Sequence, residues 1–419
     1  MKLKVKIIAF AFFAVFCSLT MAQGNYHTQP LTDEVKSIQL IVNNDPFLPS
    51  VIRLNVADAI VLKFDKLSVE EPRLRYRIFH CTADWQKDDL SDAEFLNGFN
   101  DQLMEDFRYS QNTTVNYIHY DLTLPNRQVG FKISGNYLVE IYYENAPENP
   151  LLQACFSVTE NLAQVRGDVS GNTDLDFNKS HQQLSFEILH PSLSLRDAKS
   201  EIITTIAQNG RLDNVRKNVQ STSIYPGRLV FEHNPDLIFE AGNEYRRFET
   251  QSNRFGGMGV QWVRYENPRY IAMLQTDEIR ANNARQYDQD QNGRFFIQST
   301  DGADPDVEAD YFEVHFNLKS TDFNLPVSLL GNFTFNNPEK FTLKYNSSTQ
   351  TYQLSTLLKQ GAYNYMFALP SQHAFSTEKT EGNFYETENE YLIMVYYRPQ
   401  AGRYDRLVGY RLLKSAQNK

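Results

Sequence analysis

Apolar and polar residues alternate in short segments along most of the chain, and this alternation constrains the fold more than any other feature of the sequence. Six segments of the first part repeat with a period of two: 38–42, 60–64, 74–78, 118–124, 137–143 and 152–158. A period of two places successive side chains on opposite faces, as in strands with one buried face. Six or seven such strands in this length predict an antiparallel sandwich.

The same alternation continues to the C-terminus in two further units. An acidic stretch that is poor in apolar residues, 299–310, separates these units and has the composition of a linker. We therefore predict an all-β fold of tandem antiparallel β-sandwich domains, Ig-like or E-set-like, with one short helix in the first. The predicted parts are a signal peptide at 1–22, an N-terminal sandwich at 23–160, a middle sandwich at 161–298, the acidic linker at 299–310 and a C-terminal sandwich at 311–419.

The one helical pattern of the first unit lies between Asp92 and Arg108. Four apolar residues recur there at every fourth position, behind Ser91 as a candidate N-cap: Phe95, Phe99, Leu103 and Phe107. Gly98 weakens the pattern. We expect a short or broken helix between strands.

The first residues have the features of a secretory signal. Lys2, Lys4 and Lys6 precede an apolar run at 7–19, and small residues allow cleavage before Gln23. The apolar run is shorter than the ~20 residues of a membrane-spanning helix. An exported protein is therefore expected.

Charge and the surroundings of Cys17 bear on possible partners. Without the three lysines of the signal, the chain has 38 basic and 51 acidic residues, a formal net charge of −13. Nucleic acid binding needs a basic footprint, so no nucleic acid partner is expected.

Cys17 follows Phe16 rather than Gly or Ala, which makes a poor lipidation site. No direct lipid anchor is expected.

Two cysteines, Cys81 and Cys155, remain after the signal. In an oxidising compartment they could form a disulfide, provided that their Cα atoms approach within ~7 Å. The alternative is two inert, partly buried thiols. The sequence leaves both possibilities open.

The segment His80-Cys81-Thr82-Ala83-Asp84-Trp85 contains the greatest density of chemically special side chains. A Cys-His nucleophile oriented by Asp84 would be the catalytic interpretation. Neighbouring side chains of a strand point to opposite faces, however, so His80 cannot readily reach Cys81. We favour a turn held by His80 and Asp84, with Trp85 anchored in the core. No motif for an enzyme or a cofactor is present, and we expect neither.

A second segment resembles the first half of a calcium loop. Asp288, Asp290 and Asn292 place oxygen ligands at alternate positions, and Gly293 follows. The twelfth position is Ser299 instead of the bidentate Glu that an EF-hand requires. A tight Asn-Gly turn leading into a strand is favoured over a weak calcium site.

Three segments of the last unit, 327–333, 352–357 and 361–367, are similar to the glycan-binding sandwich modules attached to starch- and glycogen-acting enzymes. Such modules hold sugar on exposed tryptophans, whereas the only tryptophans here are Trp85 and Trp262, and Phe335 stands near the position of the first. An exported glycan-binding or adhesion protein is the alternative function.

A second resemblance covers nearly the whole mature chain. Short motifs match, in order and spacing, the type IX secretion system plug protein family: 80–85, 94–99, 112–113, 117–120, 124–126, 134–137, 208–211, 241–246, 381–383 and 387–391. A series of motifs along the chain is more specific than any one of them. Cys155 is the one clear departure from the family pattern.

The resemblance implies a periplasmic protein without enzymatic activity. It would bind, as a monomer, the periplasmic mouth of the large outer-membrane β-barrel that forms the secretion channel, and would seal the channel when no substrate is in transit. The loops around 80–85 and 112–116 are the most idiosyncratic of the first unit. The expected partner-binding residues are therefore His80, Asp84, Trp85, Asn112 and Asn116.

Overall fold

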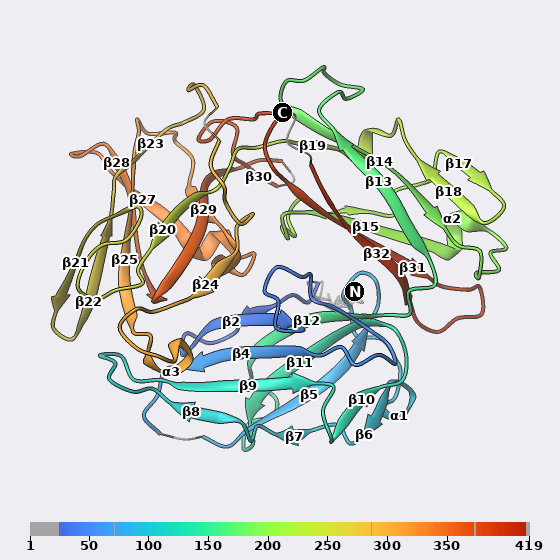
Figure 1. Cartoon of the computed structure of the whole chain (residues 1–419), viewed down its shortest axis with the longest axis horizontal. Coiled ribbons are helices and arrows are strands. Elements are labelled where there is room, and N and C mark those ends of the chain that lie inside the picture. The colour runs from blue at the N-terminus through green and yellow to red at the C-terminus, as the bar shows by residue number, and fades with distance from the viewer. Residues whose placement is uncertain (1–24, 71, 286, 373, 416–419) are drawn as a thin grey trace, which may run out of the picture.

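The computed structural model describes residues 25–70, 72–285, 287–372 and 374–415. It confirms the all-β class: three mainly antiparallel sandwiches, the first and third with some parallel strand pairs, lie in a triangle, the first at the bottom of Figure 1, the second at the right and the third at the left. The predicted signal peptide, with Cys17, lies outside the described residues. No helix among the described residues is long and apolar enough to cross a membrane.

The first sandwich consists of two facing sheets and a small ladder. One sheet has the order β1 (Gln29–Pro30), β12 (Pro150–Thr159), β11 (Gly135–Tyr143), β5 (Leu74–Cys81) and β7 (Gln102–Leu103), and β3 (Val51–Arg53) pairs with β12. The other sheet has the order β2 (Val35–Val42), β4 (Ile60–Lys66), β9 (Ile118–Leu124) and β8 (Phe107–Tyr109). The ladder joins β6 (Leu96–Gly98) and β10 (Val129–Phe131). The alternating apolar residues of both sheets meet in one core.

The second sandwich combines strands from the middle and the end of the chain. One sheet has the order β13 (Gln164–Ser170), β14 (His181–Leu189), β18 (Arg228–Phe231) and β17 (Ser223–Tyr225), and β19 (Ile238–Glu240) pairs with β14. The other has the order β16 (Arg216–Lys217), β15 (Ile202–Gln208), β31 (Glu390–Tyr397) and β32 (Arg406–Lys414). The C-terminal hairpin therefore completes the second core.

The third sandwich is one long sheet that curls around its own core. Its order is β20 (Arg246–Glu249), β29 (Gly361–Pro370), β26 (Val327–Leu330), β27 (Thr342–Asn346), β28 (Thr351–Lys359), β25 (Tyr311–Lys319), β22 (Arg269–Leu274) and β21 (Val260–Glu266). Short strands add to its edges: β23 (Asp277–Glu278), β24 (Phe295–Ile297) and β30 (Phe375–Ser376). The inward-facing residues of these strands, from Phe248 of β20 to Ala272 of β22, belong to one apolar cluster.

The strand pairing divides the chain differently from the boundaries expected from the sequence. Strands β20 to β22 belong to the third sandwich, although they precede the acidic stretch, and β31 and β32 belong to the second. The stretch 299–310 contains the helix α3 (Pro305–Glu308), whose Val307 is buried. This stretch packs between the first and third sandwiches, because groups of both sandwiches hold it.

Helices are few and short. The remaining ones are α1 (Asp92–Phe95), α2 (Ala198–Glu201) and the 3₁₀ turns η1 (Pro235–Leu237), η2 (Asn332–Thr334) and η3 (Pro338–Phe341). The helix predicted in the first unit is present, but it ends at Phe95 instead of extending toward Arg108. Gly98 has a φ of +97° and belongs to β6, and Phe99 is 82% exposed, so the fourfold spacing is not a helical face.

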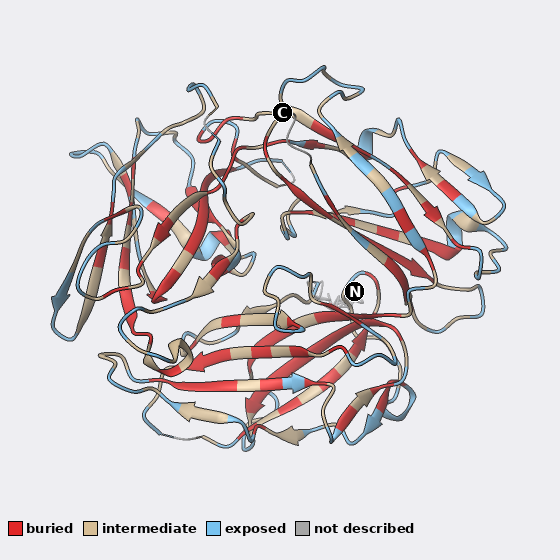
Figure 2. Ribbon diagram, viewed as in Figure 1, coloured by how far each residue is buried: buried red, intermediate tan, exposed pale blue. Residues whose placement is uncertain are grey.

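Buried positions run along the inner faces of all three sandwiches in Figure 2, and exposed positions gather in the turns and at the outer edges. The pattern follows the period-two alternation of the sequence, because each strand turns every second side chain toward a core.

The placement of the C-terminal hairpin in the second core can be tested with one buried side chain. Ile393 of β31 is fully buried and pairs with Ile206 of β15. We expect Ile393→Ala to destabilise the second sandwich by about 2–5 kcal/mol. Hydrogen exchange should accelerate in β15. The control Leu329→Ala removes a fully buried side chain from the third core and should leave β15 unchanged. Faster exchange in β29 alone after Ile393→Ala would contradict this placement.

Candidate functional site: the joints between the sandwiches

The first and third sandwiches meet at a cluster of charged side chains, which we call the first–third joint. Lys63 and Asp65 of β4 pair in register with Asp121 and His119 of β9. These four alternate with core residues such as Phe64, so they lie on the outer face of their sheet. The α3 region and the ends of β25 and β28 cover this face. The joint is thus a consequence of the strand alternation.

Asp65 is the centre of the first–third joint and is fully buried. Its Oδ1 lies 2.6 Å from His119 Nδ1, and its Oδ2 accepts hydrogen bonds from Lys359 Nζ and the Tyr311 hydroxyl, each at 2.7 Å. Lys359, also buried, donates to the Asp306 carbonyl and lies 4.1 Å from the ring centre of Tyr117. One carboxylate therefore joins two sandwiches.

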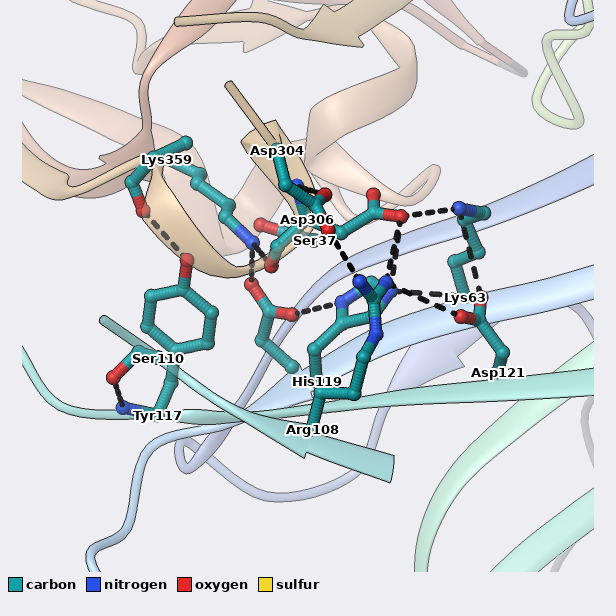
Figure 3. Close-up of polar contacts among 12 residues, drawn as sticks. Ser37, Lys63, Arg108, Ser110, Tyr117, His119, Asp121, Asp304, Asp306 and Lys359 are labelled. Atoms are coloured by element: carbon teal, nitrogen blue, oxygen red, sulfur yellow. Dashed lines mark hydrogen bonds and ion pairs between the residues drawn. The ribbon is translucent and has the colours of Figure 1, made fainter. Parts of the chain in front are cut away.

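The rim of the first–third joint carries further ion pairs (Figure 3). Lys63 Nζ lies 2.7 Å from Asp306 Oδ2 and 3.6 Å from Asp121 Oδ1. Arg108 pairs with Asp304, and its Nη2 lies 3.1 Å from Asp306 Oδ2. Across this rim, Asp304 and Asp306 of the acidic stretch pair with Lys63 and Arg108 of the first sandwich.

The charges of the first–third joint shift one another's pKa values. Burial alone would raise the pKa of Asp65, but the Lys359 charge and the hydrogen bond from His119 outweigh it and lower that pKa. Burial alone would lower the pKa of His119, but the nearby Asp121 carboxylate, the hydrogen bond to Asp65 and the Asp65 charge raise it above 6.5. Both groups are therefore favoured in their charged forms.

His119, Asp121 and Asp306 have the donor types of a metal site, and their donor atoms lie within 4.8 Å of one another. His119 Nε2 lies 3.5 Å from Asp121 Oδ1 and 3.7 Å from Asp306 Oδ2. Lys63 and Arg108 already pair with both carboxylates. These two cations oppose the binding of a metal ion, so the arrangement favours a charge network.

The first and second sandwiches meet around β32, at what we call the first–second joint. The Ala83 N–H donates to Asp405 Oδ2 at 2.8 Å, and the Tyr396 hydroxyl donates to Asn136 Oδ1 at 2.9 Å. Arg406 forms an ion pair with Glu160. A small apolar cluster lies beneath these contacts: Val51, Ala83, Met394, Tyr396 and Leu407. This joint therefore has an apolar floor and a polar rim.

The second and third sandwiches are tied by the segment that leads into β31. Arg211, which follows β15 of the second sandwich, donates from Nη2 to the carbonyl oxygen of Phe375 in β30 of the third sandwich at 2.6 Å. Gln182 Nε2 of β14 holds the segment that follows β30 by donating to the carbonyl oxygens of Tyr385 and Thr387 at 2.7 and 2.8 Å. Arg294, which precedes β24, forms an ion pair of 2.6 Å with Glu390 at the start of β31. Every pair of sandwiches is thus held by hydrogen bonds and by ions.

The residues expected to bind a partner lie at two of these joints. His80 is buried, with Nδ1 2.5 Å from Asp88 Oδ2, and the exposed Asp84 forms an ion pair of 2.9 Å with Lys217 of the second sandwich. Trp85 is half-buried and has a φ of +58°. The structure therefore brings 80–85 to the first–second joint.

Asn112 and Asn116 are exposed in the loop between β8 and β9, at the first–third joint. The backbone N–H groups of Thr114 and Val115, within the same loop, donate to Asp310 at 2.7 and 3.1 Å. This loop and the 80–85 segment lie at different joints and do not form one surface.

Cys81 and Cys155 are free thiols, so the possible disulfide is not formed. They lie on β5 and β12, and β11 separates these strands: Cys81 is opposite Asn136, and Cys155 is opposite Leu138. Burial raises the pKa of Cys81 to about 12, which disfavours a thiolate nucleophile.

The loop 288–293 forms the turn that the sequence favoured. Asp290 accepts hydrogen bonds from the backbone N–H groups of Tyr245 and Asn292, and Asp288 forms an ion pair with Arg247. Asn292 and Gly293 have positive φ values, and β24 follows. The two backbone hydrogen bonds make the Asp290 carboxylate a cap of this turn, and burial raises its pKa to about 6.

The residues of the first–third joint were not identified from the sequence. The sequence does contain a signal, since His119 and Asp121 occupy the outer face of a strand whose other face is strongly apolar. A buried charge on such a face needs a partner. The partners come from residues more than 180 positions away, which no local pattern could indicate.

The raised pKa of His119 predicts how stability changes with pH. A histidine whose folded pKa exceeds 6.5 contributes its full stability below pH 6.5 and loses it as the pH rises through the folded value. We expect the free energy of unfolding, measured with urea, to fall as the pH rises above 6.5, by at most about 1.4 kcal/mol per pH unit for one proton. His119→Gln should flatten this dependence.

Glu244→Gln is the matched control for His119→Gln. Burial raises the pKa of Glu244 to about 7. Its titration therefore lowers the free energy of unfolding as the pH rises from 4.5 to about 7 and adds no slope above that range. Above pH 7.5 the free energy of unfolding of this variant should change with pH as steeply as that of the wild type. An unchanged slope in His119→Gln would contradict the assignment to His119.

Comparison with known proteins gives two informative matches. Residues 35–160 match the family described as Type 9 secretion system plug protein 1st domain. The crystal structure of a hypothetical protein from Parabacteroides merdae ATCC 43184, at 2.30 Å resolution, is similar with a TM-score of 0.91 and 40% identity, and the match covers 94% of this chain and 100% of that one.

A further structural match is too weak to inform fold or function. The structure of the Pseudomonas fluorescens alkylpurine DNA glycosylase AlkC, bound to DNA containing an abasic site analog, matches 30% of each chain with a TM-score of 0.18 and 15% identity. No curated protein matches the chain. The range of the family match coincides with the first sandwich, which holds residues of both joints described for it. The chain belongs to the type IX secretion system plug protein family.

Proposed function

We propose that this protein is a periplasmic plug. It binds, as a monomer, the periplasmic mouth of the large outer-membrane barrel of the type IX secretion system and seals the channel when no substrate is in transit. The observation that carries the proposal is the family match over the whole first sandwich. The family is a component of a secretion system and not an enzyme family.

The arrangement of the sandwiches supports this role physically. A channel for folded cargo needs a wide stopper that keeps its shape. Three sandwiches tied pairwise by buried hydrogen bonds and ion pairs provide a broad body with little internal freedom. Breaking a buried ion pair costs about 3–5 kcal/mol, so the joints resist bending.

The partner surface proposed here includes the loop 111–116. Of the residues expected to contact the barrel, Asp84, Asn112 and Asn116 are exposed, whereas His80 is buried. Asn116 is the best probe, because Asn112 has a φ of +57° and resists substitution.

The glycan-binding alternative gains no support from the tryptophans. Trp262 lies on β21 and so belongs to the third sandwich, contrary to its assignment from the sequence to the middle unit. The Arg264 guanidinium lies 4.4 Å from the centre of its ring and stacks over it. An open platform for sugar is therefore not formed at Trp262.

Capture of the partner tests the plug proposal. The mature chain, tagged at its C-terminus, is incubated with outer membranes solubilised in mild detergent, and co-purifying proteins are identified by mass spectrometry. We expect one very large β-barrel in near-equal amount, and we expect deletion of the gene to make the envelope permeable to large antibiotics. Recovery of the tagged chain alone would contradict the proposal, and a sugar array would then test the alternative.

A matched pair of variants tests the proposed surface. Asn116→Arg introduces a long charged side chain into the exposed loop, and capture of the barrel should fall by about tenfold or more if the loop is buried in the complex. Asn172→Arg, at an exposed asparagine of the second sandwich, is the control and should bind as the wild type does.

A further inference from the structure

A cavity of about 220 Å³ opens beside the first–third joint. One wall is the start of the first sandwich, residues 30–37, and the opposite wall is the η2 and η3 region of the third sandwich. The rings of Phe335 and Phe341 line it together with polar side chains. The cavity therefore touches both sandwiches at once, and the charge network around Asp65 does not fill it.

Two lysines line this cavity without a counter-ion. Lys36 comes from β2 and Lys340 from η3, one from each sandwich. Among the described residues, no carboxylate lies within 4 Å of either ammonium group. Burial lowers the pKa of Lys36, Asp33 opposes this effect, and the charge of Lys340 lowers it further. The two positive charges are thus close enough to repel each other.

The neighbouring polar groups do not neutralise these lysines. Lys359, which also lines the cavity, is already paired with Asp65, and the Ser37 hydroxyl is hydrogen-bonded to the Tyr311 hydroxyl at 2.7 Å. The buried Thr32 hydroxyl has no hydrogen-bond partner in the described chain. One free donor and two free ammonium groups therefore share the cavity wall.

Lys36 is partly buried, so its unpaired charge is costly, and so is the unsatisfied buried hydroxyl of Thr32. Lys340 is exposed and adds a second positive charge to the cavity wall. Unpaired positive charge is also unexpected in a chain with a formal net charge of −10, which offers many carboxylates for pairing. A small anion would pair with both ammonium groups and would accept a hydrogen bond from Thr32. No side chain of the cavity wall other than Asp33 could repel it.

We propose that this cavity is a binding site for a compact oxyanion, a carboxylate or a phosphate, that bridges Lys36 of the first sandwich and Lys340 of the third. The bound anion adds a tie between the two sandwiches, parallel to the charge network of the joint. The inference is independent of the plug proposal, since it concerns binding by the isolated chain.

Thermal unfolding of the mature chain tests this site. Sodium phosphate and sodium succinate are titrated against sodium chloride at equal ionic strength and pH 7.5. We expect at least one oxyanion to raise Tm in a saturable manner beyond the effect of chloride, because a ligand that binds only the folded state stabilises it. An effect of phosphate alone would identify the ligand as a phosphate, and an effect of succinate alone would identify it as a carboxylate.

Variants of the two lysines make the test specific. Lys36→Met and Lys340→Met should each weaken the oxyanion effect by about tenfold or more in ligand concentration, since each loses a charge-assisted contact. In chloride, Lys36→Met should have a Tm equal to or above that of the wild type, because it removes an unpaired and partly buried charge. A purely structural role for Lys36 would lower Tm instead.

Lys344→Met is the control, because Lys344 is exposed on β27 of the same sandwich and does not line the cavity. This variant should keep the full oxyanion effect. The proposal is overturned if neither oxyanion stabilises the wild type more than chloride does, or if the Lys36→Met and Lys340→Met variants keep the wild-type response.

Discussion

The buried carboxylate of Asp65 is the constraint on which the arrangement of the first and third sandwiches depends. A carboxylate without water must be paired and fully hydrogen-bonded, and here a lysine, a histidine and a tyrosine do this together. Two of these partners, Lys359 and Tyr311, come from the third sandwich. Separation of the two sandwiches would leave several buried charges unpaired, so the joint acts as a single cooperative contact.

The path of the chain closes the triangle covalently as well. After the third sandwich is complete, the chain returns to the second and adds β31 and β32 to its open sheet. The outer side of this hairpin then packs on the first sandwich through Met394, Tyr396 and Leu407. The C-terminal residues therefore belong to the second core and contact the first sandwich, and Glu390 at the start of β31 pairs with Arg294 of the third.

The local parts of this fold could be predicted from the sequence, and the long-range parts could not. Alternation at positions such as Leu74, Tyr76 and Ile78 is set by each strand's own buried face, so strand positions and fold class follow from it. The pairing of β31 with β15 joins residues about 190 positions apart and leaves no periodic signal. Boundaries inferred from composition therefore assigned β31 and β32 to the C-terminal sandwich, whereas they belong to the second.

The acidic stretch shows why composition misled. Asp304, Asp306 and Asp310 have the polarity of a solvated linker, but in the structure they accept an arginine, a lysine and two backbone N–H groups of the first sandwich. A solvated linker and an ionic joint contain the same residue types, and they differ only in whether cations and N–H groups of another sandwich pair with the carboxylates.

The same ambiguity applies to the segment 80–85, where the Ala83 N–H and the Asp84 carboxylate pair with Asp405 and Lys217 of the second sandwich. In a protein built from several sandwiches, the most distinctive motifs can serve the assembly of the body itself. The surface left for an external partner is then formed by the exposed loops between these motifs, among which 111–116 lies beside the joint that orients it.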